Sequence, residues 1–412
     1  MKRLFTASLV VFAALTLFAA PKAHAEGFAL YEWGARASGL ANGMVGRADD
    51  ASAVAHNPAG ITQLPGTQLM LGATMITPKM TIDGVKGGET THTRTQRHYF
   101  FTPHGYVTHQ FNDTVWFGFG AFTRFGLGNQ YGTGWAGVNN LEDVNLQTIS
   151  LNPNLAFRVT DSLSLAIGIE GMVARMKMHK MSYGAYQEMT GRNDLGVGFN
   201  AAAHYKFNDQ WSAGLAYRSA INHRVSGDST FFSKIMGMDL SGRLKAHLRL
   251  PDMISAGVAY KPLPNLSFEA GTVYTVWSRF RNFNVHFSNP VQKMLGAGDM
   301  YVPKNWKDTW LFNLSVEYLP LDWLALRLGY SYETSPINER YADYMVETNG
   351  RSRYSCGVGF ILDNWTIDLA YTMLRARALD YNTAATTGTG VVPGRSHHGI
   401  THTAALTVGY KF

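Results

Sequence analysis

Nearly the whole sequence alternates between apolar residues and small or polar residues. In the segment WTIDLAYTM, Trp365, Ile367 and Leu369 share one face, whereas Asp368 and Ala370 lie on the other. Successive side chains of a β-strand point to opposite faces of the sheet, so this period of two predicts an all-β chain. The apolar face could form the core of a soluble sandwich or contact lipid around a membrane barrel, and alternation alone does not separate the two.

The connections between these segments fall into two length classes that alternate along the chain. Six short turn signals lie at residues 112–113, 160–161, 208–209, 262–265, 320–322 and 363–364. Seven longer polar or mixed stretches cover roughly residues 83–97, 128–146, 178–193, 225–242, 284–306, 335–350 and 376–399. Short periplasmic turns, long external loops and an even strand number are typical of outer-membrane barrels. We therefore predict a 14-stranded antiparallel transmembrane β-barrel over residues 65–412.

The first 25 residues have the features of a signal peptide. Lys2 and Arg3 precede an apolar run over residues 4–20, and Ala23-His24-Ala25 is a small-x-small cleavage site. An uncleaved anchor is the alternative. Removing this segment takes away three Lys or Arg and no acid, so the net charge of +7 falls to a mild and scattered +4. Without a basic cluster, nucleic acid is not predicted as a partner.

The mature composition and the last strand both favour the bacterial outer membrane. Aromatic residues make up 13% of the chain and charged residues only 16%, and after residue 25 no apolar run is long enough for a transmembrane helix. Cys356 is the only cysteine, so an internal disulfide is excluded. The last strand, THTAALTVGYKF, ends on Phe412 with Tyr410 two residues before it, a pattern typical of strands read by the outer-membrane assembly machinery. We expect a monomer in contact with outer-membrane lipids and, during assembly, with that machinery.

Residues 26–64 do not alternate and precede the first strand. Asp49-Asp50 can cap a short helix over residues 51–55, and Asn57-Pro58 would end it. A barrel of fourteen strands encloses a lumen wide enough for water, which a compact apolar segment could fill as a plug. The alternative is a disordered periplasmic tail, but Phe28 and Trp33 are too apolar to leave in water.

A family resemblance rests on GLANGMVGRADDASAVAHNPAGITQL, which is similar to the N-terminus of the FadL family of outer-membrane long-chain fatty-acid transporters. Asn57, Pro58 and Ala59 stand where that family has its Asn-Pro-Ala signature. Further matching stretches lie at residues 125–137, 148–175, 250–262, 302–320 and 330–339, so the resemblance covers essentially the whole mature chain. It implies a barrel with an N-terminal hatch, passive uptake of hydrophobic compounds from outside, an apolar pocket near the hatch and lateral release at a kink in the third strand. It also implies that the Asn-Pro-Ala segment sits against that kink.

Candidate site residues follow from this resemblance and from residue chemistry. Glycines inside the third strand, residues 114–128, permit a kink or make room for the plug, so gating is assigned to Asn57, Pro58, Ala59, Gly118, Phe119 and Gly120. An apolar capture patch is expected in the loop after the seventh strand, and the predicted hydrophobic contacts are Phe28, Phe231, Phe232, Ile235, Met236, Met238 and Leu240. Packing of that loop against itself is the alternative. Arg175 and Lys307 are predicted to bind the substrate carboxylate from the lumen side, with interior ion pairing as the alternative.

The sequence gives little support for catalysis. It has no Gly-x-Ser-x-Gly elbow, its histidines are dispersed, and no cofactor or metal motif occurs. We therefore predict a transporter of long-chain fatty acids that is not an enzyme. Uptake of toluene-like aromatic hydrocarbons is the alternative within the family, and a general porin or an outer-membrane hydrolase are alternatives outside it.

Overall fold

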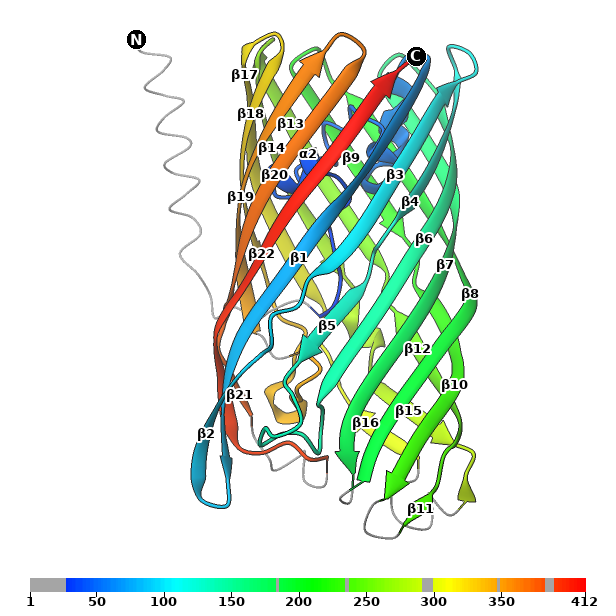
Figure 1. The fold of residues 1–412 in the computed structure, drawn as a ribbon. Helices are drawn as coiled ribbons and strands as arrows, with labels where there is room; N and C mark the ends of the chain where they lie inside the picture. The colour runs from blue at the N-terminus through cyan, green and yellow to red at the C-terminus, as the bar shows by residue number, and fades with distance from the viewer. Residues whose placement is uncertain (1–26, 183–184, 234–236, 291–298, 347–348, 382–388) are drawn as a thin grey trace.

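The computed structural model describes residues 27–182, 185–233, 237–290, 299–346, 349–381 and 389–412. The predicted signal peptide, residues 1–25, lies outside these ranges. The remaining chain forms one antiparallel sheet that closes on itself, because β1 pairs with β22 from Gln68↔Lys411 to Gly84↔Gly394 (Figure 1).

The sheet contains fourteen barrel strands, as predicted, and several of them consist of two consecutive pieces. In chain order they are β1 (Thr67–Lys86), β3 (Phe100–Gln110), β4 (Val115–Phe122) with β5 (Gly126–Gln130), β6 (Asp143–Arg158), β7 (Leu163–Ser182), β8 (Ala185–Lys206), β9 (Trp211–Arg218) with β10 (Ile221–Ser233), β12 (Gly242–Leu250) with β13 (Met253–Leu263), β14 (Leu266–Thr275) with β15 (Asn282–Phe287), β17 (Thr309–Leu321), β18 (Leu324–Glu333), β19 (Asn349–Leu362), β20 (Trp365–Arg377) and β22 (Gly394–Lys411). Shorter pieces at the long-loop end are β2 (Glu89–Arg94), β11 (Met238–Asp239), β16 (Met300–Pro303), β21 (Leu379–Tyr381) and the 3-10 turn η4 (Glu339–Tyr341). The 3-10 turn η2 (Trp277–Arg279) lies between β14 and β15.

The strands turn their apolar face outward. On β7, Ile167 and Ile169 are 64% and 63% exposed, whereas Ala166 and Glu170 on the opposite face are buried. An exposed apolar band around a closed sheet matches a lipid-facing wall and leaves the small and polar residues inside. The alternation that is ambiguous in the sequence therefore belongs to a membrane barrel.

Short turns and long connections alternate as predicted, but three of the expected long loops are mostly strand. The predicted loop over residues 83–97 holds the end of β1, to Lys86, and β2. β7 continues to Ser182 and β8 begins at Ala185, so the predicted loop over residues 178–193 is a long ribbon. The predicted loop over residues 225–242 likewise begins inside β10, which continues to Ser233. Polar side chains do not end a strand whose backbone still has a partner, and these ribbons keep their ladder pairs to their tips.

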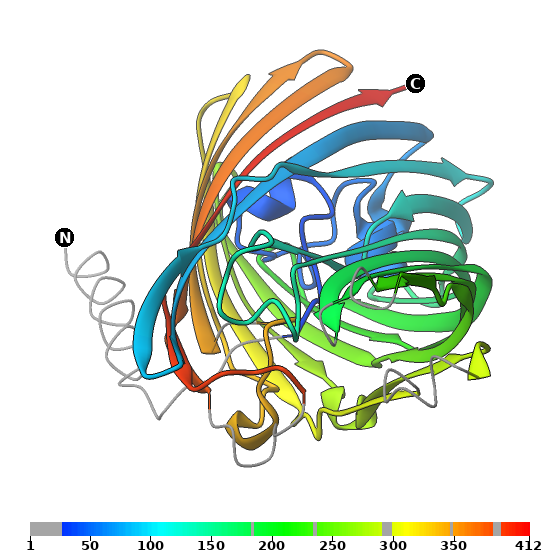
Figure 2. The ribbon, with the colours of Figure 1, turned by 60° about the horizontal axis from the view of Figure 1, so that its bottom comes forward.

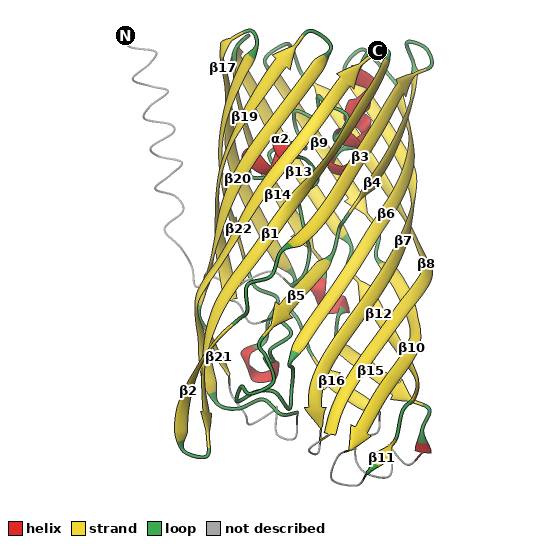
Figure 3. Ribbon diagram, viewed as in Figure 1, coloured by secondary structure: helices red, strands yellow, loops and turns green. Residues whose placement is uncertain are grey.

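Residues 27–64, called here the luminal segment, lie inside the barrel toward its short-turn end (Figure 2). The segment contains α2 (Ala35–Gly39), α3 (Ala53–His56) and the 3-10 turn η1 (Pro58–Gln63), drawn in red within the strands in Figure 3. α2 packs on β18, β19 and β20, and η1 packs on β4, β6, β7 and β8. Within the described ranges, no helix has the length and apolar character needed to cross a membrane.

Candidate transport site

The third barrel strand is interrupted at residues 123–125. Its first part, β4, pairs with β3 on one side and β6 on the other. Its second part, β5, pairs with β6, and in the described part of the chain it has no ladder with β3. Between the two parts, the Thr148 hydroxyl donates to the Phe125 carbonyl at 2.6 Å and accepts from the Phe125 amide at 3.3 Å. The wall therefore has an unpaired interval between residues 100–104 of β3 and β5.

The luminal segment forms the backbone contacts at this interruption. The Leu30 amide donates to the Arg124 carbonyl at 2.8 Å, and the Gly126 amide donates to the Phe28 carbonyl at 2.9 Å. Ala29 and Phe125 form an isolated antiparallel bridge. The beginning of the luminal segment thus joins the break in the wall, so that a displacement of one would disturb the other.

A cavity of about 770 Å³ extends from this junction. Its lining includes Phe28 and Leu30 inside the barrel and Phe101, which is 66% exposed, on the outer face. It therefore connects the lumen with the outer surface beside the unpaired interval. The side chains of Phe100 and Leu30 narrow the interval. A Cβ added at Gly128 would lie 2.0 Å from the Phe100 ring, and a Cβ added at Gly126 would lie 2.8 Å from Leu30 Cδ1.

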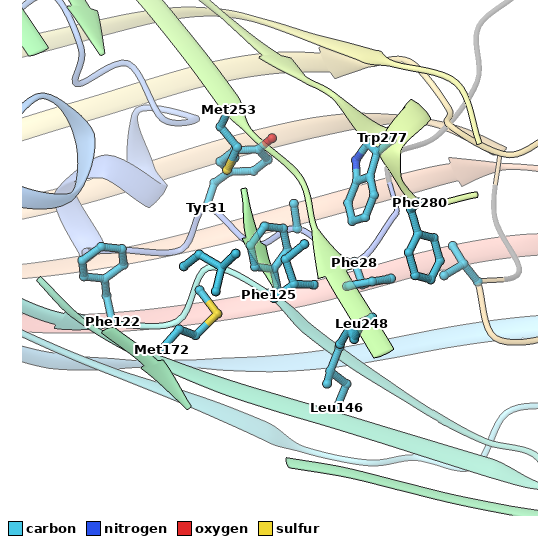
Figure 4. Close-up of a cluster of buried hydrophobic side chains, with 14 of the residues drawn as sticks. Phe28, Tyr31, Phe122, Phe125, Leu146, Met172, Leu248, Met253, Trp277 and Phe280 are labelled. Carbon is cyan, nitrogen blue, oxygen red and sulfur yellow. The ribbon is translucent and has the colours of Figure 1, made fainter. Parts of the chain in front are cut away.

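An aromatic cluster surrounds Phe28, which is only 3% exposed (Figure 4). Its ring centroid lies 4.9 Å from that of Trp277, 5.6 Å from Phe280, 5.8 Å from Trp306 and 6.2 Å from Phe125. Edge-to-face aromatic pairs at such distances add to the stabilisation given by buried area. Phe28, predicted as a hydrophobic contact, therefore lies between this cluster and the cavity.

A fully buried ion cluster links the interruption to the luminal segment. Arg124, inside the interruption, and Arg218, at the end of β9, contact the same Glu170 oxygen at 3.0 and 3.1 Å. Ser150 donates to the other Glu170 oxygen at 2.7 Å. Arg218 also donates to the carbonyl oxygens of residues 54 and 55 in the luminal segment at 2.7 and 2.8 Å.

A second polar network fixes the luminal segment on its other side. Glu269 accepts from the amides of Val45, Gly46 and Arg47 at 2.8, 3.0 and 2.9 Å. Arg36 bridges Glu317 of the barrel and Asp49 of its own segment, both at 2.8 Å. Burial alone would raise the pKa of Asp49, but Arg36 beside it brings that pKa below its ordinary value.

A cavity of about 440 Å³ lies at the short-turn end. Its lining includes charged residues of the second network, Arg36, Arg47, Asp49 and Glu317, together with Asp368. The luminal segment therefore contributes to two cavities of different character, a largely apolar one at the wall interruption and a charged one at the short-turn end.

The structure contradicts the expected lumen-facing positions of Arg175 and Lys307. Arg175 shares the exposed outer face of β7 with Val173, while Ala174 points inward. It lies at the outer rim of the larger cavity, directly opposite Arg192 of β8. Lys307 is exposed, and it is Lys304 whose ammonium is buried, in an ion pair with Asp343.

The predicted gating residues occupy two different places. Gly118, Phe119 and Gly120 lie within the regular part of β4, before the interruption. A Cβ at Gly118 or Gly120 would lie 2.7 or 2.9 Å from Val54, so these glycines make room for the luminal segment.

The Asn-Pro-Ala turn contacts β8 of the barrel. Asn57 donates to the carbonyl oxygens of Val45 at 2.9 Å and Ala203 at 3.0 Å, and accepts from the Ala59 amide at 3.2 Å. Pro58 begins η1. The backbone contacts at the interruption come from residues 28–30, whereas η1, which begins at Pro58, packs on β4 before the interruption.

The predicted capture patch is divided between two environments. Phe231 packs with Ala185 and Leu240 in a small buried cluster, as expected if this region packs on itself. Phe232 and Met238 are 45% and 46% exposed. Ile235 and Met236 lie outside the described residues.

The sequence interpretation missed the buried ionic residues Arg124, Arg218, Glu170 and Glu269. A usable signal was present for Glu170, which falls on the polar face of an otherwise apolar alternation, IGIEGMV, and must therefore point into the lumen. No such signal exists for Arg124, because its segment is not strand. Across the described residues, no group of three or more His, Cys, Asp and Glu is placed to hold a metal ion.

A closed barrel with an apolar outer face, an occupied lumen and a cavity through its wall defines a membrane channel for hydrophobic compounds. Residues 16–412 match the family described as "Outer membrane protein transport protein (OMPP1/FadL/TodX)". The chain belongs to this family of outer-membrane transport channels, which are not enzymes, and its location is the bacterial outer membrane.

Individual relatives are distant but match over most of their length. Outer membrane protein P1 of Haemophilus influenzae is 26% identical over 428 residues, covering 90% of this chain and 91% of that protein. The long-chain fatty acid transport protein of Salmonella typhi is 23% identical over 421 residues, covering 92% and 94%. A Pseudomonas aeruginosa FadL homologue superposes with a TM-score of 0.83 at 19% identity, covering 94% of this chain and 100% of that one. The P. putida toluene transporter TodX gives 0.72 at 16% identity, covering 92% and 98%. These two structures share the fold.

Proposed function

We propose that this channel takes up long-chain fatty acids and releases them sideways into the outer membrane through the interval between β3 and β5. The observation that carries the proposal is the cavity of about 770 Å³ that reaches from the luminal segment to the outer face. Sites that bury a small apolar ligand commonly have volumes in this range. The luminal segment acts as the hatch, because its residues 28–30 join the interruption in the wall.

Two arginines favour a substrate that carries a carboxylate. Arg351 and Arg353 line the inner part of the cavity, where they pair with Glu333 at 2.9 Å and Glu32 at 3.2 Å. A fatty-acid carboxylate can replace one of these acids, because guanidinium groups bind carboxylates through charge-assisted hydrogen bonds. The carboxylate role therefore moves to Arg351 and Arg353, because Arg175 lies on the outer face and Lys307 is exposed between β16 and β17.

The same ion pairs also support uptake of aromatic hydrocarbons as a second candidate. If both arginines keep their acidic partners during transport, the inner part of the cavity offers a neutral substrate the aromatic cluster around Phe28, with both guanidinium charges already paired. TodX, the P. putida relative of similar fold, is named as a toluene transporter, whereas the Salmonella typhi relative is named for long-chain fatty acids. A general porin fits less well because the luminal segment occupies the lumen.

Competition against a fluorescent long-chain fatty acid on the purified protein distinguishes these candidates. We expect oleate to displace the probe and toluene to do so weakly. Arg351→Gln should weaken oleate about tenfold, as for loss of one charge-assisted hydrogen bond, and leave toluene unchanged. Arg375→Gln is the matched control, since Arg375 is exposed on the outer face of β20. Displacement by toluene but not by oleate would overturn the fatty-acid assignment in favour of aromatic hydrocarbons.

A further inference from the structure

Five basic side chains on neighbouring strands of the outer wall lack an ionic partner. Arg175, Arg192, Arg224, Lys245 and Arg249 are exposed on β7, β8, β10 and β12. Among the described residues, none of these five forms an ion pair or a side-chain hydrogen bond. β7 pairs with β8, β8 with β10 and β10 with β12, and these strands lie next to one another in Figure 1. The five side chains therefore lie on one continuous part of the wall. We call this patch the basic belt.

The ladder registers bring these charges close together. Arg175 lies directly opposite Arg192, Arg192 opposite Ser226, and Ser226 opposite Lys245. Directly opposed residues have Cβ atoms about 5 Å apart, and like charges in that position are destabilising. Adjacent strands are about 4.8 Å apart, so the backbone positions of Arg192 and Lys245, two strands apart, are separated by only about 10 Å. Anions from outside the chain would relieve this repulsion, so the row of cations favours an anionic ligand.

The depth of the belt identifies the kind of anion. On the side toward the short turns, the outer face continues with exposed apolar residues, including Val173, Val197 and Phe199. On the side toward the long loops, the next row of charges has its own acids: Lys177 pairs with Glu188 at 3.3 Å and Arg243 with Asp228 at 3.6 Å. Arg175, Arg192 and Lys245 thus lie between the lipid-facing band and a row that is already neutralised, at the level where lipid headgroups meet acyl chains. Arg224 and Arg249 lie two and four residues further toward the short turns.

We propose that the basic belt is a binding site for a phosphate-bearing lipid of the outer leaflet, with its phosphates on the belt and its acyl chains on Val173, Val197 and Phe199. Five cations over four strands match a headgroup with several phosphates better than a single carboxylate. The cavity also reaches Arg175 and Arg192, so the bound lipid would lie beside the outer opening of the wall. This inference does not depend on the identity of the transported compound.

The test measures binding of fluorescent bisphosphorylated lipid A to the purified barrel in phosphatidylcholine nanodiscs. Each Lys or Arg near an anionic lipid surface contributes roughly 1 kcal/mol, so the triple variant Arg175→Gln, Arg192→Gln, Lys245→Gln should bind about 100-fold more weakly. The matched control removes the same charge at the short-turn end through Lys206→Gln, Lys261→Gln and Lys411→Gln, and should change the affinity less than about threefold. The charge-conserving triple variant Arg175→Lys, Arg192→Lys, Lys245→Arg should retain binding. It shows that the belt tolerates three substitutions without loss of the fold.

Several results would overturn the proposal. Equal binding by the triple Gln variant would show that the belt is not the site, and equal binding of lipid A stripped of its phosphates would show that phosphate is not recognised. Displacement of lipid A by inorganic phosphate at the same molar concentration would show a site for the free ion. Displacement by equimolar oleate would show a carboxylate site belonging to transport.

Discussion

The Glu269 carboxylate joins the barrel to three consecutive residues of the luminal segment, and replacing it with Gln should unseat that segment. The side chain is fully buried, and its two oxygens accept from three consecutive amides, Val45, Gly46 and Arg47, and from the Arg47 guanidinium at 3.2 Å. An amide group retains one oxygen and places an NH₂ donor against N–H groups. Two of the four hydrogen bonds are lost, either those from the Val45 and Gly46 amides at one oxygen or those from the Arg47 amide and guanidinium at the other. Each is worth roughly 2 kcal/mol because the acceptor is charged and buried, which gives about 4 kcal/mol.

Hydrogen exchange of the luminal segment measures this loss. When opening and reclosing are fast, the exchange rate follows the population of the open state, and about 4 kcal/mol corresponds to nearly a thousandfold increase. The reporter is the peptide over residues 52–63, which contains α3 and η1 and has no direct bond to Glu269. Glu89→Gln is the matched control, because Glu89 is exposed on the β1–β2 ribbon.

Two outcomes would refute this reasoning. If the reporter peptide keeps its protection within about threefold while the Val45–Arg47 amides alone exchange faster, the segment is seated by packing and the clamp is local. If strands remote from the lumen, such as β20, lose protection to the same degree, Glu269 stabilises the barrel as a whole and does not act on the segment.

Three further predictions concern the wall interval, the ion cluster and pH. Phe100→Ala removes the ring that lies over Gly128 and should raise the rate of fatty-acid entry into proteoliposomes several-fold. The control Phe111→Ala, at a short turn, should leave this rate unchanged. An unchanged rate in Phe100→Ala would mean that the interval is not the exit. Arg124→Gln leaves Glu170 with one cationic partner and should cost about 3–5 kcal/mol of unfolding free energy in urea, as for other broken buried ion pairs; a change below about 1 kcal/mol would contradict this. Burial, with the nearby positive charge of Arg218, lowers the pKa of His56 to about 3. Between pH 6.5 and about 3, His56 therefore stays neutral in the seated segment, whereas His56 of a displaced segment takes up a proton. Acidification through this window should therefore increase channel openings in planar bilayers, and His56→Gln should reduce that increase; an equal increase in the variant would exclude His56 as the cause.

The fold could be predicted because two local patterns are repeated along the whole chain. The period of two gives the strands and their apolar face, and the alternation of short and long connections gives the strand number. The prediction was wrong where polarity was used to mark the ends of strands, as at residues 178–193, because ladder pairing continues above the membrane without any need for apolar residues. The break at residues 123–125 was expected from the glycines of the third strand, and it lies between Gly120 and Gly126, whereas Gly118 and Gly120 make room for Val54.

The site residues were harder to predict because they depend on which way a side chain points. Counting alternate positions from Ile167 and Ile169 places Arg175 on the outer face. The wrong prediction that Arg175 faces the lumen could therefore have been avoided from the sequence. Counting alternate positions cannot show that Lys304 is the buried lysine and Lys307 the exposed one, because the residues between β16 and β17 are not strand. Contacts between the luminal segment and the wall join residues more than two hundred positions apart, such as Gly46 and Glu269, and no local pattern reports them.

The distribution of polarity inside the barrel favours a sideways route for an apolar substrate over a route along the axis. The cavity at the short-turn end is lined by Arg36, Arg47, Asp49, Glu317 and Asp368, most of which are engaged in ion pairs across the lumen. Moving a chain of about fifteen methylene groups from an apolar surface into such a watery, charged space would cost about 0.8 kcal/mol per group, or roughly 12 kcal/mol. The opening beside Phe101 instead leads to the apolar outer face of the same barrel, where this cost does not arise. The ion pairs that hold the luminal segment in place thus also make the axial path unfavourable, which supports a wall opening as the exit for hydrophobic compounds.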